Sequence, residues 1–176
     1  MNAKQLNAFQ SAWVVDDIEV AALHWAEHAG VGPFFVADYH EGVLEESTYR
    51  GAPAPITMKT ALAQAGDMQI ELIQPTGIHR NIYRDTVPVG KPAFHHIAVW
   101  TDNFEVDLAK YVDKGFEIAA SGRAGGAVRF AYIDTCASLG HMVELVEDTQ
   151  DVRSVFQMIT DASLNWDGSN PVRDYG

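Results

Sequence analysis

Two glutamates lie inside apolar segments, at positions where the interior of a strand would normally hold hydrophobic residues. Glu71 lies in MQIELIQP, residues 68–75, and Glu144 lies in HMVELVE, residues 141–147. An ionised carboxylate in an apolar environment is costly unless another group compensates its charge. A bound metal ion is the explanation that we favour, because the two glutamates occupy corresponding positions of a repeat. Either glutamate taken alone could equally face water at the edge of a sheet.

The repeat is an order of secondary structure that occurs twice. Residues 9–17 predict a strand and residues 17–29 a helix that starts at Asp17 and ends before Gly30. Successive antiparallel strands are expected in the segments 33–40, 43–51, 57–66 and 68–75. The pattern restarts in FHHIAVWTD, with a strand, a helix and three further strands over 94–102, 103–114, 116–122, 127–135 and 141–147. The order β-α-β-β-β therefore appears twice, with extended strands or a loop in residues 36–60 making the first unit longer, and each glutamate lies in the last strand of its unit.

The first strands of the two units align without gaps, which places Gln10 over His96. If the units pack side by side, four residues can converge: Gln10, Glu71, His96 and Glu144. One amide oxygen, one imidazole and two carboxylates suit a divalent ion such as Zn, Ni, Co, Mn or Fe. His95 faces the opposite side of a regular strand, and it becomes the ligand if the register differs by one residue.

The composition restricts the class of protein and its partners. Asp and Glu number 24 against 12 Lys and Arg, and the formal net charge of −12 argues against nucleic acid or an anionic membrane as partner. The single Cys136 excludes an internal disulfide and fits a reducing compartment. No apolar run reaches the ~18 residues of a membrane span, and MNAKQLNAFQ lacks the apolar core of a signal peptide. We therefore expect a cytoplasmic protein that binds a small molecule.

The repeated module, its DIE helix start, IELIQP and the closing ELVE resemble the vicinal oxygen chelate superfamily over about residues 9–148. This superfamily includes glyoxalase I, methylmalonyl-CoA epimerase, extradiol dioxygenases and antibiotic-resistance proteins. The resemblance implies an α+β fold in which two paired βαβββ modules form a curved mixed sheet around a metal cleft. We expect the first module with its connector, the second module, and a C-terminal helix and tail in residues 1–90, 91–150 and 151–176. By analogy with the superfamily, we expect a homodimer.

The resemblance also implies roles for the converging residues. The order Gln, Glu, His, Glu is similar to the metal ligands of zinc-type glyoxalase I, where the two glutamates also act as acid and base. Glu71 and Glu144 would then bind the metal and move a proton beside a substrate carbonyl. Val14 and Pro75 stand where glutathione-dependent glyoxalase I has an Arg and an Asn that hold glutathione, which argues against glutathione as substrate. The epimerases instead have His at the Gln10 position and Gln at the Glu71 position.

The sequence therefore predicts a metal-dependent, glyoxalase-like enzyme, a lyase, isomerase or epimerase that acts on a small and fairly apolar oxygenated compound. Two alternatives stay open: a protein of the same fold that binds a drug or metabolite without catalysis, and an iron-dependent ring-cleaving dioxygenase. Four residues are candidates for lining the substrate pocket, although each could equally be a core residue: Val14, Phe35, Trp100 and Phe130.

Overall fold

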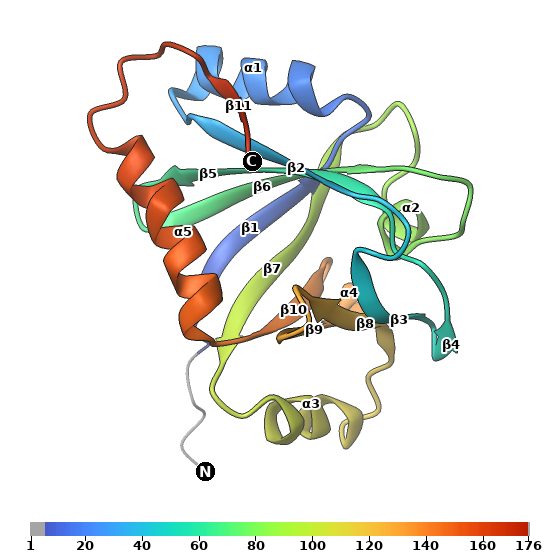
Figure 1. The fold of residues 1–176 in the computed structure, drawn as a ribbon. Coiled ribbons are helices and arrows are strands. Elements are labelled where there is room, and N and C mark those ends of the chain that lie inside the picture. Colours follow the sequence, from blue (N-terminus) through green and yellow to red (C-terminus); the bar gives the residue numbers. More distant parts are fainter. Residues whose placement is uncertain (1–5, 176) are drawn as a thin grey trace.

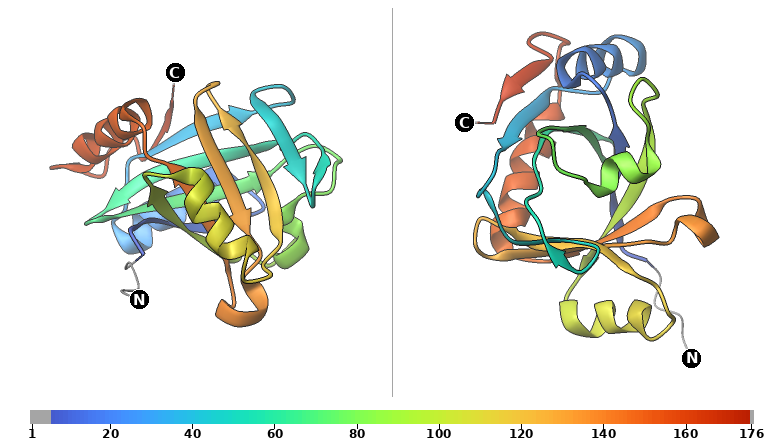
Figure 2. Two further views of the ribbon diagram at one scale, coloured as in Figure 1. Left: turned by 90° about the horizontal axis from the view of Figure 1, so that it is seen from below. Right: turned by 90° about the vertical axis from the view of Figure 1, so that its right-hand side faces the viewer.

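The computed structural model describes residues 6–175 and shows one mixed sheet of 11 strands with helices on its outer side and at its two ends (Figure 1). The first module supplies strands β1 Ala8–Val14, β2 Phe34–Tyr39, β5 Met58–Ala65 and β6 Met68–Pro75. The second module supplies strands β7 Ala93–Thr101, β8 Ile118–Ala124, β9 Val128–Ile133 and β10 Met142–Glu147. The sheet is strongly curved, as the two further views in Figure 2 show.

The two modules join through their first strands. The order β2-β5-β6-β1 of the first module meets the order β7-β10-β9-β8 of the second, and β1 pairs with β7 in antiparallel orientation. Within each module the first and last strands are parallel neighbours, β1 with β6 and β7 with β10. The repeated βαβββ unit and the curved mixed sheet predicted from the sequence are therefore confirmed.

Two helices cover the outer face of the sheet. Helix α1, Ile18–Ala29, packs on β5 and β6, and helix α3, Phe104–Val112, packs on β9 and β10. The side chain of Asp17 accepts a hydrogen bond from the backbone of Val20, which caps the first turn of α1. Gly30 ends α1 in the left-handed conformation at φ 65°, which a glycine adopts without steric cost.

The segment after β2 departs from the expected order of strands. Strand β3, Leu44–Tyr49, pairs with β8 of the second module instead of with its sequence neighbours, and β4, Ala52–Pro53, lies outside it at the edge of the sheet. The prediction of successive antiparallel strands within the first module is wrong at this point. By crossing over, β3 covers the edge of β8 that would otherwise present unpaired backbone groups.

The two ends of the curved sheet are closed differently. Helix α2, Ile82–Thr86, occupies one end, where Ile82 and Tyr83 pack into a core cluster with Val14 and Met142. Helix α5, Gln150–Ser163, lies across the other end and runs from the second module toward the first (Figure 1). The short helix α4, Cys136–Leu139, precedes β10.

The C-terminal tail joins the sheet. Strand β11, Val172–Asp174, pairs in parallel with β2. Trp166 lies against Gly32, where even a Cβ atom would come within 2.7 Å of the indole ring. Within residues 6–175, no helix is both long and apolar enough to cross a membrane.

Candidate metal centre

The pairing of β1 with β7 relates the two modules by an approximate twofold axis. Gln10 lies opposite Ala98, and Ala12 lies opposite His96. A twofold rotation that exchanges Gln10 with His96 also exchanges Ala12 with Ala98, and it therefore maps each pair onto the other. The strand register therefore agrees with the alignment of Gln10 and His96 made from the sequence.

The last strand of each module places its glutamate at this axis. Ala12 is paired with Glu71 of β6, and Ala98 is paired with Glu144 of β10. Because paired residues of neighbouring strands point to the same face of a sheet, four polar side chains project from one face: Gln10, Glu71, His96 and Glu144. The fully buried Ala12 and Ala98 between them leave room for these larger groups to approach one another.

Three of these side chains meet closely enough to share an ion. One oxygen of Glu71, one of Glu144 and a ring nitrogen of His96 all lie within 4.8 Å of one another. His96 Nε2 lies 3.1 Å from Glu144 Oε2 and 3.4 Å from Glu71 Oε2. All three residues are buried, and His96 is 0% exposed. Burying two carboxylates is costly unless a positive charge compensates them.

The cluster leaves two ligand atoms unsatisfied. Despite the short contacts, Glu71 Oε2 and His96 Nε2 have no hydrogen-bond partner among the residues that the structure describes. Burial raises the pKa of Glu71. The nearby His96 opposes this shift, and the charge of Glu144 adds to it. Burial alone would lower the pKa of His96, but the two carboxylates outweigh it and raise that pKa. A divalent cation would satisfy both orphaned atoms and offset the carboxylate charges, so these residues fit a metal site.

Gln10 lies beside the cluster and is oriented by a residue that the sequence analysis missed. The Gln10 Nε2 group donates a hydrogen bond of 2.6 Å to Gln69 Oε1, and both residues are buried. With its nitrogen used in this way, Gln10 keeps its carbonyl oxygen as the atom able to bind a metal. Gln69 lies two residues before Glu71, so strand alternation on β6 was a signal that could have identified it.

Strand alternation predicted that His95 faces away from the site, and this prediction is wrong: His95 points into the interior. Ala12 of β1 pairs with His96 of β7, but the next residue, Trp13, pairs with Phe94. His95 is therefore the extra residue of a β-bulge. The bulge turns His95 into the interior, where it is 2% exposed and its Nδ1 lies 3.0 Å from His96 Nδ1. The nitrogen that reaches the carboxylates is Nε2 of His96.

A cavity of about 320 Å³ opens from the cluster toward helix α5. Gln10, Glu71 and Glu144 lie in its wall, and its other wall residues include the aromatic side chains Phe9, Phe35, Phe130 and Phe156. Two of the expected substrate-binding residues, Phe35 and Phe130, therefore lie at the cavity.

The other two expected substrate-binding residues, Val14 and Trp100, lie in the core and are not among the described residues that line the cavity. Val14 belongs to the cluster around helix α2, at the closed end of the sheet. Trp100 stacks on Phe9 with ring centroids 3.7 Å apart, so it supports the cavity wall from behind Phe9.

Two tyrosines, the partly buried Tyr39 and the buried Tyr132, lie in the wall of the cavity. Burial raises the pKa of both Tyr39 and Tyr132, and the charges of Glu71 and Glu144 raise these pKa values further. Both phenols therefore stay protonated at neutral pH, and the Tyr132 hydroxyl lies 3.3 Å from the hydroxyl of Tyr83 on α2. Neither tyrosine was identified as a site residue from the sequence.

Comparisons with known proteins support the same fold. A family model described as the Glyoxalase/Bleomycin resistance protein/Dioxygenase superfamily matches residues 9–132, more than half of the chain. Methylmalonyl-CoA epimerase from Mycobacterium tuberculosis superposes with a TM-score of 0.56 at 19% identity, covering 88% of this chain and 97% of that one. A hypothetical protein from Bacillus halodurans C-125 gives 0.58 at 16% identity, with 84% and 97% covered.

A third similar structure is a variant of Streptomyces coelicolor methylmalonyl-CoA epimerase in complex with 2-nitronate-propionyl-CoA. It superposes with a TM-score of 0.55 at 18% identity, covering 83% of this chain and 99% of that one. A search of curated protein sequences finds no significant match.

Proposed function

Because the chain belongs to the glyoxalase, bleomycin resistance protein and dioxygenase superfamily, we propose that it is a metal-dependent enzyme that transfers a proton beside a substrate carbonyl. The observation that carries the proposal is the buried trio of Glu71, His96 and Glu144 at the base of an apolar cavity. The structures of methylmalonyl-CoA epimerases, which share this fold, favour an isomerase or epimerase over the other reaction types.

The proposed metal ligands are His96 Nε2, one oxygen each of Glu71 and Glu144, and the carbonyl oxygen of Gln10. A divalent ion held there would act as a Lewis acid that stabilises negative charge on a substrate oxygen. The ion would also account for the two buried atoms that lack hydrogen-bond partners, on Glu71 and His96.

The two glutamates are the proposed acid and base. They come from corresponding strands of the two modules, so they approach the cavity from opposite sides of the twofold axis. One carboxylate can remove a proton from the carbon beside the carbonyl, and the other can return a proton to the opposite face.

The cavity wall favours a compact, apolar substrate over a coenzyme A thioester. The residues that line it within the described chain include no lysine or arginine, and Asp151 lies among them. Phosphate groups are bound mainly by such cations or by clustered backbone amides. We therefore propose an uncharged substrate, such as a small ketone or hydroxyketone with an aromatic or aliphatic group.

The first experiment combines metal analysis with proton exchange. The purified wild type is analysed for metal and then assayed in D₂O with Zn, Ni, Co, Mn or Fe, using a phenyl-substituted α-hydroxyketone as probe. We expect one divalent ion per chain and deuterium incorporation beside the carbonyl. Glu144→Gln should lower the exchange rate about 10²- to 10⁴-fold, the usual contribution of general acid–base catalysis.

A matched control separates catalysis from general effects of charge removal. Glu105→Gln makes the same substitution at an exposed residue that pairs with Arg129, and it should leave exchange unchanged. Circular dichroism and metal content are recorded for each variant. A wild type that binds the probe but holds no ion and exchanges no proton would be a sequestering protein, and the proposed enzyme function would be wrong.

A further inference from the structure

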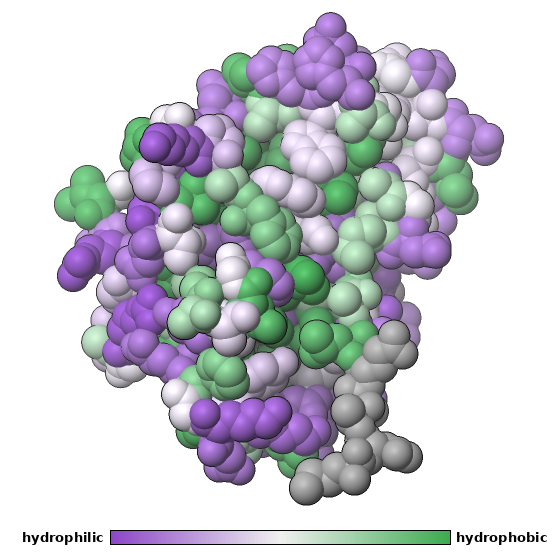
Figure 3. All heavy atoms as spheres, turned by 180° about the vertical axis from the view of Figure 1, so that it is seen from behind, coloured by the Kyte–Doolittle hydropathy of each residue, from purple (hydrophilic) through white to green (hydrophobic). Residues whose placement is uncertain are grey.

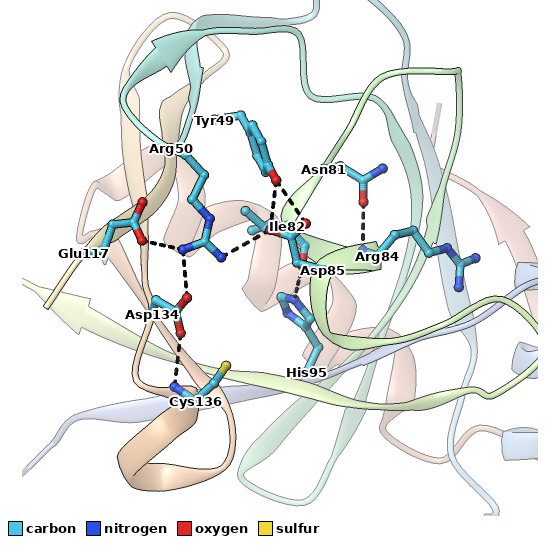
Figure 4. Close-up of polar contacts among 10 residues, drawn as sticks. All are labelled: Tyr49, Arg50, Asn81, Ile82, Arg84, Asp85, His95, Glu117, Asp134 and Cys136. Carbon is cyan, nitrogen blue, oxygen red and sulfur yellow. Dashed lines mark hydrogen bonds and ion pairs between the residues drawn. The ribbon is translucent and has the colours of Figure 1, made fainter.

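Two hydrogen bonds connect the backbone of helix α2 to the proposed metal ligand. His95 Nε2 lies 3.3 Å from the carbonyl oxygen of Ile82, a contact drawn in Figure 4. His95 Nδ1 lies 3.0 Å from His96 Nδ1, and His96 Nε2 faces Glu71 and Glu144 on the far side of its ring. The three groups form a continuous line from Ile82 to the carboxylates.

The chemistry of these groups fixes where the protons lie. A carbonyl oxygen can only accept, so His95 Nε2 carries the hydrogen that it donates to Ile82. The two Nδ1 atoms can share only one hydrogen. If His95 supplied that hydrogen too, its ring would be a cation held between a neutral carbonyl and another imidazole, in a site that is 2% exposed. The neutral His95 therefore accepts at Nδ1, and His96 donates its Nδ1–H.

We propose that His95 is a positioning residue, which holds His96 as the Nδ1–H form and thereby directs His96 Nε2 at the two carboxylates as a ligand atom. This inference rests on the proposed metal centre. An outer partner of this kind fixes both the tautomer and the ring orientation of a ligating histidine. The edge-to-face packing of Tyr132 on His96, with ring centroids 5.0 Å apart, holds the same orientation from the side.

The Ile82 carbonyl is itself held in place by a network at the closed end of the sheet. Arg50, which follows β3, contacts Asp85 of helix α2 at 3.2 Å, and Tyr49 donates a hydrogen bond to the same carboxylate (Figure 4). The Asn81 side chain caps the start of α2 by accepting from the Arg84 backbone. The crossing segment β3 therefore helps to fix the acceptor of the first hydrogen bond.

The first test determines the protonation of His95 directly. Imidazole ¹⁵N shifts are measured by NMR for the ¹⁵N-labelled wild type, both metal-free and loaded with diamagnetic Zn²⁺. We expect His95 to show a protonated Nε2 and an unprotonated Nδ1 in both samples, and zinc-loaded His96 to show a protonated Nδ1. A protonated Nδ1 on His95 would overturn the proposal.

The second test compares two substitutions whose side chains have the same branched shape and the same number of heavy atoms. His95→Asn keeps an oxygen acceptor near the former Nδ1 position, whereas His95→Leu provides none, and both lose the bond to Ile82. We expect His95→Leu to weaken Zn²⁺ binding about 10- to 100-fold, measured by competition with a chromophoric chelator, and His95→Asn to recover most of the loss. Equal affinities of these two variants would overturn the role of the acceptor.

These readouts separate the inference from the proposed function. If the wild type binds no divalent ion, the proposed function fails, and the His95 shifts of the metal-free protein still decide whether the hydrogen-bond chain exists. If the wild type binds zinc but the His95 shifts show the other tautomer, only the positioning role is wrong. Thermal unfolding of both variants shows whether a lost affinity merely reflects a disrupted fold.

Discussion

At the scale of single residues, the site depends on side chains that need an unusual environment to be tolerated. Glu71 and Glu144 are buried beside His96, and the three groups leave two atoms without a hydrogen bond in the described chain. Gln10 is fixed by Gln69 rather than by the acids. This arrangement gives Gln10 the role of a neutral fourth ligand, which can be tested separately from the charged ones.

Replacing Gln10 by methionine should weaken Zn²⁺ binding without abolishing it. The substitution removes the carbonyl oxygen at nearly constant size, while the three charged or imidazole ligands remain. We expect affinity to fall by at least about tenfold, which corresponds to about 1.4 kcal/mol. Chelator competition measures the change, and Gln157→Met on the exposed side of α5 is the control. An unchanged affinity would mean that Gln10 serves only as a partner of Gln69.

At the scale of elements, the crossing of β3 connects the two modules away from the site. The Arg50 guanidinium lies 2.6 Å from Glu117 and 2.8 Å from Asp134, in addition to its contact with Asp85 of α2. Burial alone would raise the pKa of Asp134, but the Arg50 ion pair and the Cys136 backbone amide lower it below its usual range. The network therefore joins β3, α2 and the end of β9.

Replacing Arg50 by glutamine should destabilise the fold by about 1 kcal/mol at neutral pH, the upper range for partly exposed ion pairs. A carboxylate whose pKa is lowered in the folded state adds stability above its unfolded pKa, about 3.9 for Asp, and loses it as the pH falls through the folded value. The difference from wild type should therefore be largest near pH 7 and shrink below about pH 4.

Urea denaturation at several pH values measures this difference. Arg123→Gln, which removes a more exposed pair with Glu46, is the matched control and should have a smaller effect. A penalty for Arg50→Gln that stays constant down to pH 3 would show that the lost stability comes from packing rather than from the ion pairs.

At the scale of the whole molecule, the proposed site spans the junction of the two modules within one chain. Two ligands come from β1 and β6 of the first module and two from β7 and β10 of the second. An ion bound there would connect the modules in the folded state only.

The homodimer stays a prediction. On the face of the molecule shown in Figure 3, hydrophilic residues gather mainly along the margins and hydrophobic residues lie between them.

Removal of the metal should lower the melting temperature of the whole domain. An ion at about 100 times its Kd stabilises the folded state by about 2.7 kcal/mol, provided that the unfolded chain does not bind it. For a domain of this size, that change corresponds to roughly 5–10 °C. Calorimetry before and after dialysis against a chelator measures the shift, and Zn²⁺ should restore it. A melting temperature that is indifferent to both treatments would argue against an ion between the modules.

The sequence by itself determined the repeat and most of the candidate site. Strand alternation and the apolar surroundings of Glu71 and Glu144 identified the shared face, because a period of two residues is a local property of a strand. The gap-free alignment of Gln10 with His96 predicted how the modules would be related. The order of elements in each unit followed from capping residues and turn glycines, which are local signals too.

The tertiary structure alone decided the features that depend on partners distant in sequence. The bulge that turns His95 inward arises from the pairing of β7 with β1, and regular alternation gives no sign of it. The crossing of β3 to β8 depends on an open sheet edge that exists only after the second module has folded. Val14 is buried in the core cluster around α2, whereas Phe130 of the same cluster also lies in the wall of the cavity that faces α5. Such choices are made by the packing of whole elements, which no local pattern encodes.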